Sequence, residues 1–246
     1  MSSFQDQVVC ITGASRGIGR SLAIAFAREG ASLVLGARSV PQLEALASEL
    51  GEKAIAVPTD VRSKHEVERL VETAHAEFGR LDIMINNAGV AIYGPFEGVS
   101  EDELDEMLQT NVKGAFFGSQ AAFKVMKAQR DGLILNVSSI AGKLHLPNEA
   151  AYNASKWALN GFTGTLSLEA RHYNVRVTSV CPGGVNTPFW KEQEFLPFPS
   201  SMDPERDFLD PDHVAQSILD IARLPASCVV PEMVLLPMIA PPPDLS

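Results

Sequence analysis

The stretch at residues 8–19, VVCITGASRGIG, constrains the fold more than any other part of the sequence. Its first four residues are apolar and mostly β-branched, which predicts a buried strand. Turn residues follow, and apolar residues then recur at helical spacing at Ile18, Leu22 and Phe26. The stretch therefore predicts a strand, a tight turn and a helix. The glycines of the turn are Gly13, Gly17 and Gly19.

Glycines at such a turn let a large anion approach the backbone closely, because there is no Cβ in the way. The helix behind the turn offers unpaired N–H groups and the positive end of its dipole. We therefore expect this turn to bind the pyrophosphate of a dinucleotide. The spacing is G-x-x-x-G-x-G rather than the commoner G-x-G-x-x-G, so these letters alone also allow a glycine turn without a ligand.

Apolar runs and helical periodicities alternate along the rest of the chain. A long helix is expected at about 152–172, another at about 101–128 with a kink at Gly114, and a third at 211–224. The pattern predicts an α/β fold of the Rossmann-type doubly wound class, a mainly parallel seven-stranded sheet with helices on both faces. The seventh strand is expected at the edge, because Pro231 cannot donate to a ladder. Strands are expected at residues 8–11, 32–36, 54–57, 81–85, 133–137, 175–180 and 228–230.

Length and charge narrow the classes of function. The 246 residues suit one domain over residues 1–246, with a proline- and aromatic-rich substrate loop at about 184–210 and an irregular proline tail at 241–243. The formal net charge of −10 argues against nucleic acid or an anionic membrane as the main partner. No secretory signal or membrane-spanning stretch is visible, so we expect a cytoplasmic protein.

Cysteine and histidine usage gives no sign of metal chemistry. Cys10, Cys181 and Cys228 lie far apart without a C-x-x-C pair, and we expect all three to be small buried hydrophobic residues in a reducing compartment. The five histidines show no ligand spacing, so no metal site is expected.

Polar and glycine residues follow most of the predicted strands, and in a parallel sheet these turns meet at one edge, where ligands bind. In chain order the motifs are T-G-x-x-x-G-I-G at 12–19, N-N-A-G at 86–89, Asn111, N-V-S-S at 136–139, Y-x-x-x-K at 152–156 and P-G at 182–183. With this set, residues 7–234 resemble the classical short-chain dehydrogenase/reductase (SDR) family. The resemblance implies a Rossmann fold, a nicotinamide cofactor and a homodimer or homotetramer.

Tyr152 and Lys156 are four residues apart and therefore share one helix face. A phenol must lose about three units of pKa to act as a base at neutral pH, which requires about 4 kcal/mol. A lysine charge about 4 Å away supplies that much at an effective dielectric constant of about 20. We therefore expect Lys156 to lower the pKa of Tyr152, and Tyr152 to move a proton to or from a substrate oxygen. The alternative is a solvent-exposed helix pair.

Two further residues complete the expected catalytic group. Ser139, at the carboxyl end of a strand, can hydrogen-bond the same substrate oxygen as Tyr152. The resemblance further implies that Lys156 holds the nicotinamide ribose and that Asn111 holds a water that relays the proton.

The end of the second strand favours NADP(H) over NAD(H). A carboxylate there would bond a ribose 2′-hydroxyl and repel a 2′-phosphate, but the strand ends in Arg38 and no acid follows before Glu44. Arg38 and Arg16 can offer fixed positive charges to a phosphate, although both could also be merely solvated. Partly by the resemblance, the expected cofactor contacts are Gly13, Ser15, Arg16, Gly17, Ile18, Gly19, Arg38, Asp60, Val61, Asn87, Ala88, Gly89, Tyr152, Lys156, Pro182, Gly183, Val185 and Thr187.

The favoured function is NADPH-dependent reduction of a small ketone or aldehyde to an alcohol, or the reverse. Reduction of 3-oxoacyl thioesters is one alternative, although the last residues of the chain lack the glycine-rich segment with which such reductases usually end. A non-catalytic NADP-binding regulator is another. The sequence does not identify the substrate, because loop residues set it. Aromatic residues of the substrate loop, expected to form either an apolar lid or an oligomer contact, are Phe189, Trp190, Phe195 and Phe198.

Overall fold

The computed structural model describes residues 4–238, and its centre is a seven-stranded sheet in the order β3-β2-β1-β4-β5-β6-β7. Every pairing between neighbouring strands is parallel. This confirms the predicted doubly wound α/β fold. The strands are β1 (Val8–Thr12), β2 (Ser32–Ala37), β3 (Ala54–Pro58), β4 (Ile83–Asn86), β5 (Gly132–Val137), β6 (Val175–Pro182) and β7 (Glu232–Leu235).

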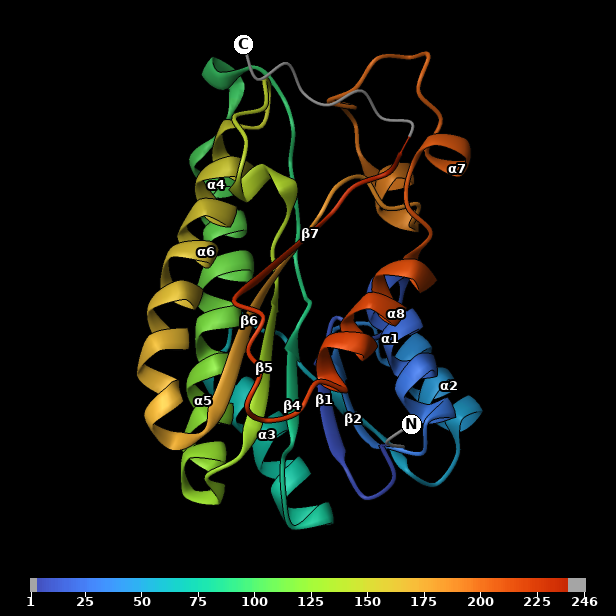
Figure 1. The fold of residues 1–246 in the computed structure, drawn as a ribbon. Coiled ribbons are helices and arrows are strands. Elements are labelled where there is room, and N and C mark those ends of the chain that lie inside the picture. The colour runs from blue at the N-terminus through green and yellow to red at the C-terminus, as the bar shows by residue number, and fades with distance from the viewer. Residues whose placement is uncertain (1–3, 239–246) are drawn as a thin grey trace.

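Helices cover both faces of the sheet (Figure 1). One layer contains α1 (Gly17–Arg28), α2 (Val40–Leu50) and α8 (Pro211–Ala222), and the opposite layer contains α3 (Lys64–Phe78), α5 (Ala115–Gln129) and α6 (Ala150–Ala170). Alternate residues of β1 feed two cores: Val9 and Ile11 pack towards the first layer, and Val8 and Cys10 towards the second. Burial on both faces explains why the strand sequence is apolar throughout rather than alternating.

Shorter helices complete the structure. They are η1 (Phe96–Gly98), α4 (Glu101–Met107), η2 (Leu108–Gly114), η3 (Ile140–Gly142), η4 (Arg171–Tyr173), η5 (Pro188–Glu192) and α7 (Pro204–Asp207). No helix within residues 4–238 is long and apolar enough to cross a membrane. The predicted proline tail at 241–243 lies outside the described residues.

The helix expected at 101–128 is present, but its middle is not α-helical. After α4, which begins with a capping box between Ser100 and Glu103, the chain forms the π-helical segment η2 and only then α5. A Cβ on Gly114 would lie 2.7 Å from Cγ2 of Val61, so a side chain larger than hydrogen does not fit there. The predicted kink at Gly114 is thus the end of a π-helical turn, a feature often found at functional sites.

The seventh strand begins later in the chain than the sequence predicts. Residues 228–230 are not a strand, and β7 begins only after Pro231, whose carbonyl accepts the N–H of Ser179. The proline ring therefore precedes the ladder instead of ending it. Cys228, which donates its N–H to the Pro225 carbonyl, is exposed rather than buried, whereas Cys10 and Cys181 are buried as predicted.

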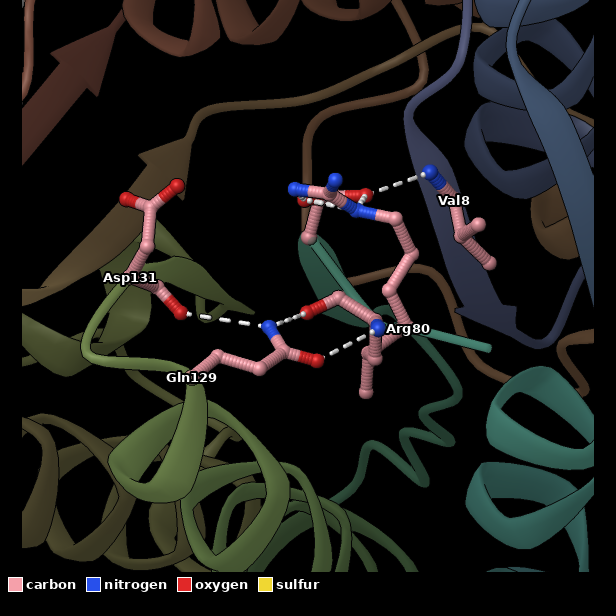
Figure 2. Close-up of polar contacts among 6 residues, drawn as sticks. Val8, Arg80, Gln129 and Asp131 are labelled. Atoms are coloured by element: carbon pink, nitrogen blue, oxygen red, sulfur yellow. Dashed lines mark hydrogen bonds and ion pairs between the residues drawn. The ribbon is translucent and has the colours of Figure 1, made fainter. Parts of the chain in front are cut away.

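A polar cluster joins three segments at the amino ends of the strands (Figure 2). The buried carboxylate of Asp82 accepts the N–H of Val8 at 2.8 Å and the Nε of Arg80 at 2.9 Å. The side-chain amide of Gln129 bonds both the N–H and the carbonyl of Leu81, at 3.0 and 2.8 Å, and also reaches the carbonyl of Asp131. These bonds tie β1, the start of β4 and the end of α5 together, opposite the edge where ligands bind.

Asp82→Ala is expected to lower the free energy of unfolding by about 2–4 kcal/mol, because it leaves the buried Val8 N–H without an acceptor and Arg80 without its carboxylate. Asp131→Ala is the matched control, since only the backbone of Asp131 bonds Gln129. Its expected cost is below about 0.5 kcal/mol. Urea denaturation measures both, and equal stability of the two variants would contradict this account of the cluster.

Candidate active site

A cleft of about 850 Å³ opens at the carboxyl edge of the sheet. Its walls come from the segments after β1, β2, β3, β4, β5 and β6, together with the start of α6 and the stretch around η5. Parallel strands place all these turns on one side of the sheet, which is why segments far apart in the sequence meet there.

The glycine turn forms the floor of the cleft. Gly13 and Gly17 have φ values of +65° and +52°, which favour glycine. A Cβ on Gly13 would lie 2.8 Å from the Cα of Ala88, and one on Gly19 would collide with the carbonyl oxygen of Gly13. Arg16, the N-cap residue of α1, makes no side-chain cap bond, so the first amides of the helix have no side-chain acceptor. The floor therefore fits an anion held by backbone amides, as a dinucleotide pyrophosphate requires.

The segment after β4 is locked against this turn. The Thr12 hydroxyl accepts the N–H groups of Asn87 and Ala88 at 3.0 and 3.1 Å. The Asn87 amide in turn donates to the carbonyls of Thr12 and Gly13 at 3.0 and 3.2 Å. The N-N-A-G motif thus holds the floor in shape as well as lining the cleft.

Three charged groups lie along the end of the cleft formed by β2 and β3. Arg38 is exposed at the cleft and, among the described residues, no hydrogen bond or ion pair engages it. Arg16 forms an ion pair with Glu192 of η5. The carboxylate of Asp60 is bonded by Arg62, and this holds the pKa of Asp60 below its usual range. Of the two arginines predicted to face a phosphate, Arg38 is the one without a competing partner.

Tyr152, Lys156 and Ser139 come together in the cleft, from α6 and the end of β5. Lys156 is buried, with its Nζ 3.1 Å from the Val137 carbonyl and 5.6 Å from the centre of the Tyr152 ring. The Ser139 hydroxyl accepts the N–H of Ala141 at 3.1 Å, and its own hydrogen can be donated to the phenol oxygen of Tyr152 or to a ligand. The alternative of a solvent-exposed Tyr152–Lys156 pair is therefore wrong.

The predicted electrostatics of this pair are also wrong for the protein without ligand. Burial raises the pKa of Tyr152 well above its ordinary value, and the hydrogen-bonding side chain of Ser139 opposes only part of that shift. Burial lowers the pKa of Lys156 to about 8. Desolvation outweighs the attraction between ammonium and phenolate because both groups lose water in the same enclosed site. Tyr152 is thus held as the neutral phenol.

Asn111 lies in the π-helical segment η2 and does not line the cleft. Its Oδ1 accepts the N–H of Val90 at 2.8 Å, and its Nδ2 donates to the Val90 carbonyl at 2.8 Å and to the Ser155 hydroxyl at 3.0 Å. These contacts hold the segment after Gly89 against α6. The water-holding role implied by the resemblance stays a prediction.

The cleft brings together nearly all residues predicted to contact the cofactor. Gly19 is the exception: it lies behind the floor, where it lets α1 approach the turn. The predicted residues that do line the cleft are Gly13, Ser15, Arg16, Gly17, Ile18, Arg38, Asp60, Val61, Asn87, Ala88, Gly89, Ser139, Tyr152, Lys156, Pro182, Gly183, Val185 and Thr187.

The substrate end of the cleft is apolar and aromatic. Phe189, Trp190 and Phe198 line it as predicted, whereas Phe195 is exposed and does not. Sequence reasoning missed Tyr93, whose ring lies 5.6 Å from that of Tyr152 and stacks on Trp190 at 6.0 Å. It also missed Glu149, which lines the same cleft. The only signal for Tyr93 and Glu149 in the sequence was their closeness to the N-N-A-G and Y-x-x-x-K motifs.

Within residues 4–238 no cluster of three or more metal-ligating side chains is present.

Comparison with known proteins identifies the family. The family model of short chain dehydrogenases matches residues 7–195. An uncharacterized oxidoreductase of Staphylococcus saprophyticus is 34% identical over 247 residues, which cover 96% of this chain and 98% of that protein. The chain therefore belongs to the short-chain dehydrogenase family of oxidoreductases, as its motifs predicted.

Solved structures agree with this assignment. An alcohol dehydrogenase from the archaeon Thermococcus sibiricus, in complex with 5-hydroxy-NADP, has a TM-score of 0.87 at 32% identity and covers 96% of this chain and 99% of its own. A 3-ketoacyl-(acyl-carrier-protein) reductase from Brucella melitensis, in complex with NADH, has a TM-score of 0.87 at 30% identity, with coverage of 95% and 97%.

Gly19→Ala is expected to lower the free energy of unfolding by about 1–3 kcal/mol, because the new methyl group meets the rigid Gly13 carbonyl. Gly164→Ala on α6 is the control, since a Cβ there meets no atom within 4 Å. It is expected to leave stability unchanged or raise it by up to about 1 kcal/mol. Thermal denaturation compares the two, and a Gly19 variant as stable as the Gly164 variant would refute the close packing of the turn.

Proposed function

We propose that this protein is an NADPH-dependent carbonyl reductase that converts a ketone or aldehyde to an alcohol. The observation that carries the proposal is the enclosed phenol of Tyr152, beside Lys156 and Ser139, in a cleft whose glycine floor suits a dinucleotide. The family membership supports a nicotinamide cofactor, since the two solved relatives described above are complexed with 5-hydroxy-NADP and NADH. When bound, that cofactor supplies the hydride.

Tyr152 is proposed to donate the proton. A phenol with a raised pKa stays protonated at neutral pH, and an alkoxide developing on a carbonyl carbon is basic enough to take that proton. The hydroxyl hydrogen of Ser139 is proposed to bond the same oxygen and to stabilise its developing charge. Because the raised pKa keeps Tyr152 protonated at neutral pH, the residue starts in the form that reduction requires.

Lys156 is proposed to hold the cofactor ribose. Its Nζ carries three donors when protonated, and the Val137 carbonyl is its one hydrogen-bond partner among the described residues, so donors are left for sugar hydroxyls. With a pKa of about 8 the ammonium form predominates at neutral pH. Asn111 is proposed to be a positioning residue, because its hydrogen bonds to Val90 fix the segment at Gly89 and Val90 beside the Lys156 amine.

NADPH is proposed over NADH because Arg38, at the end of β2, forms no hydrogen bond or ion pair with any residue that the structure describes. A guanidinium there can hold a 2′-phosphate by charge-assisted bonds. Arg16 would have to leave Glu192 to join it, so Arg38 is expected to contribute most of the preference.

Features of the same site also bear on two alternative functions. A 3-oxoacyl thioester reductase finds some support in the Brucella melitensis relative, but the aromatic residues at the substrate end favour a compact substrate. A regulator that only binds NADP would need neither Tyr152 nor Ser139. Turnover on a panel of carbonyl compounds, followed by NADPH oxidation, decides between an enzyme and a regulator.

A cytoplasmic homodimer or homotetramer is proposed as the working form. Large apolar side chains stay exposed on the outer faces of α5 and α6, namely Phe116, Trp157 and Leu168. Such a row of exposed apolar groups is typical of a surface that associates with another copy.

Tyr152→Phe is expected to lower kcat for carbonyl reduction by at least about 100-fold, because it removes the proton donor. NADPH affinity, measured by fluorescence titration, should stay within about threefold. Tyr173→Phe is the control, because Tyr173 packs against Phe123 outside the cleft. A Tyr152 variant that retains wild-type turnover would sink the proposed mechanism.

Arg38→Ala is expected to raise KM for NADPH by about 10- to 100-fold, the value of a charge-assisted hydrogen bond. KM for NADH should change by less than about threefold, since NADH lacks the phosphate. Arg20→Ala serves as the matched loss of charge, because Arg20 pairs with Glu49 away from the cleft. Equal effects on both cofactors, or a wild-type preference for NADH, would overturn the assignment.

A further inference from the structure

One ionisable group in the cleft, Glu149, takes no part in the proposed proton transfer or cofactor binding. Glu149 directly precedes α6, and its side chain lines the cleft while the residue is only 8% exposed. Its backbone is fixed on both sides, with its N–H donating to Leu146 and its carbonyl accepting from Asn153. Its carboxyl group, by contrast, makes no hydrogen bond and no ion pair with any residue between 4 and 238.

A carboxylate that is largely withdrawn from water and has no protein partner is costly, and proteins rarely keep one without a use. Burial raises the pKa of Glu149 to about 7. The other ionisable side chains that line the cleft do not relieve this cost: Asp60 is itself anionic, and Arg16, Arg38 and Lys156 form no ion pair with Glu149. These three cations are also the groups proposed to face the cofactor. Glu149 is therefore an anionic position at the substrate end that the protein leaves unpaired.

Aromatic rings share this end of the cleft with Glu149. Burial raises the pKa values of Tyr93 and Tyr152, and the charge of Glu149, which lines the same cleft, raises both further. Tyr93 stacks nearly parallel to Trp190, with ring centres 6.0 Å apart and planes 10° apart, and meets Phe189 edge-on. Aromatic faces carry partial negative charge and attract cations. The substrate end thus combines one unpaired carboxyl group with aromatic rings, and both favour a ligand with a positive charge.

We propose that Glu149 and the rings of Tyr93 and Trp190 bind a protonated amine on the substrate. The enzyme's substrates would then be amino ketones or amino aldehydes, and its products amino alcohols. This inference rests on the proposed carbonyl reduction for the reaction itself, but the cation site stands on its own geometry. An ammonium group supplies the missing counter-charge, and the formal charge of −10 on the protein attracts cations to its surface. A substrate carboxylate would be repelled.

Equilibrium binding tests the cation site without turnover. The probes are 2-phenylethylammonium and its uncharged counterpart 2-phenylethanol, titrated calorimetrically into the protein saturated with NADPH. The wild type is expected to bind the ammonium at least about 10-fold more tightly than the alcohol, the value of one charge-assisted bond. Glu149→Gln should bring this ratio close to one, and Glu72→Gln, an exposed carboxyl on α3, should leave it unchanged.

The pH dependence gives a second readout. Affinity for the ammonium should rise as pH increases through about 7, because the Glu149 carboxyl must lose its proton to pair with a cation. The lining groups Tyr93 and Tyr152 stay neutral in this range, and the other charged side chains that line the cleft are Arg16, Arg38 and Asp60. Lys156, with a pKa of about 8, also titrates nearby, but its contribution persists in Glu149→Gln. The part of the pH dependence lost in that variant belongs to Glu149.

The ratio of the ammonium affinity to the alcohol affinity decides whether the cation site exists. A wild-type ratio near one, or a ratio unchanged in Glu149→Gln, overturns the proposal. If Glu149→Gln does not bind NADPH and so is not folded, the Glu149→Asp variant and the pH profile of the wild type replace it. An ammonium-to-alcohol affinity ratio that falls in Glu149→Asp but stays above one, together with wild-type ammonium affinity that rises through pH 7, supports the proposal. A wild-type affinity that does not change with pH overturns it.

The proposed reaction is tested separately with aryl methyl ketones that carry an aminomethyl group or its neutral isostere, an ethyl group. A higher kcat/KM for the amino ketone in the wild type, lost in Glu149→Gln, supports both proposals. Ammonium binding without turnover of either ketone would remove the proposed reaction and leave the cation site.

Discussion

The parallel pairing of β1 with β2 on one side and with β4 on the other is the constraint on which the rest of the molecule depends. It places the glycine turn, Arg38 and the N-N-A-G segment at one edge, where the Thr12 hydroxyl and the Asn87 amide bond the turn to the N-N-A-G segment. The cluster around Asp82 fixes the same strands at the opposite edge. The cleft is therefore a consequence of strand direction and register, and its side chains decide only what it binds.

Desolvation is the main electrostatic influence within that cleft. It raises the pKa values of Tyr93, Tyr152 and Glu149 and lowers that of Lys156. Each of these shifts favours the neutral form of the group over its charged form. Charged ligands would supply counter-charges to the site: a phosphate beside Arg38 and, in our proposal, an ammonium beside Glu149. Such a site discriminates by charge because unpaired buried groups are costly.

The sequence predicted the parts of the site that depend on local pattern. The glycine turn, the Tyr152–Lys156 spacing and the free Arg38 follow from short motifs and from the alternation of strands and helices. It could not predict that burial would outweigh the Lys156 charge at Tyr152, because the depth of a site is a tertiary property. Tyr93 and Glu149 were missed for the same reason, since only the folded chain brings them to Tyr152. The π-helical turn at Asn111 and the start of β7 depend on packing against Val61 and pairing with Ser179.

Enclosure keeps Tyr152 as a neutral phenol, ready to donate its proton. Ultraviolet titration of the cofactor-free wild type, minus the same titration of a Tyr152→Phe variant, isolates the ionisation of this one residue. The account predicts no phenolate from Tyr152 below pH about 10, the ordinary pKa of a tyrosine. A difference signal with its midpoint near neutral pH would show that the Lys156 charge outweighs burial, and would contradict the account.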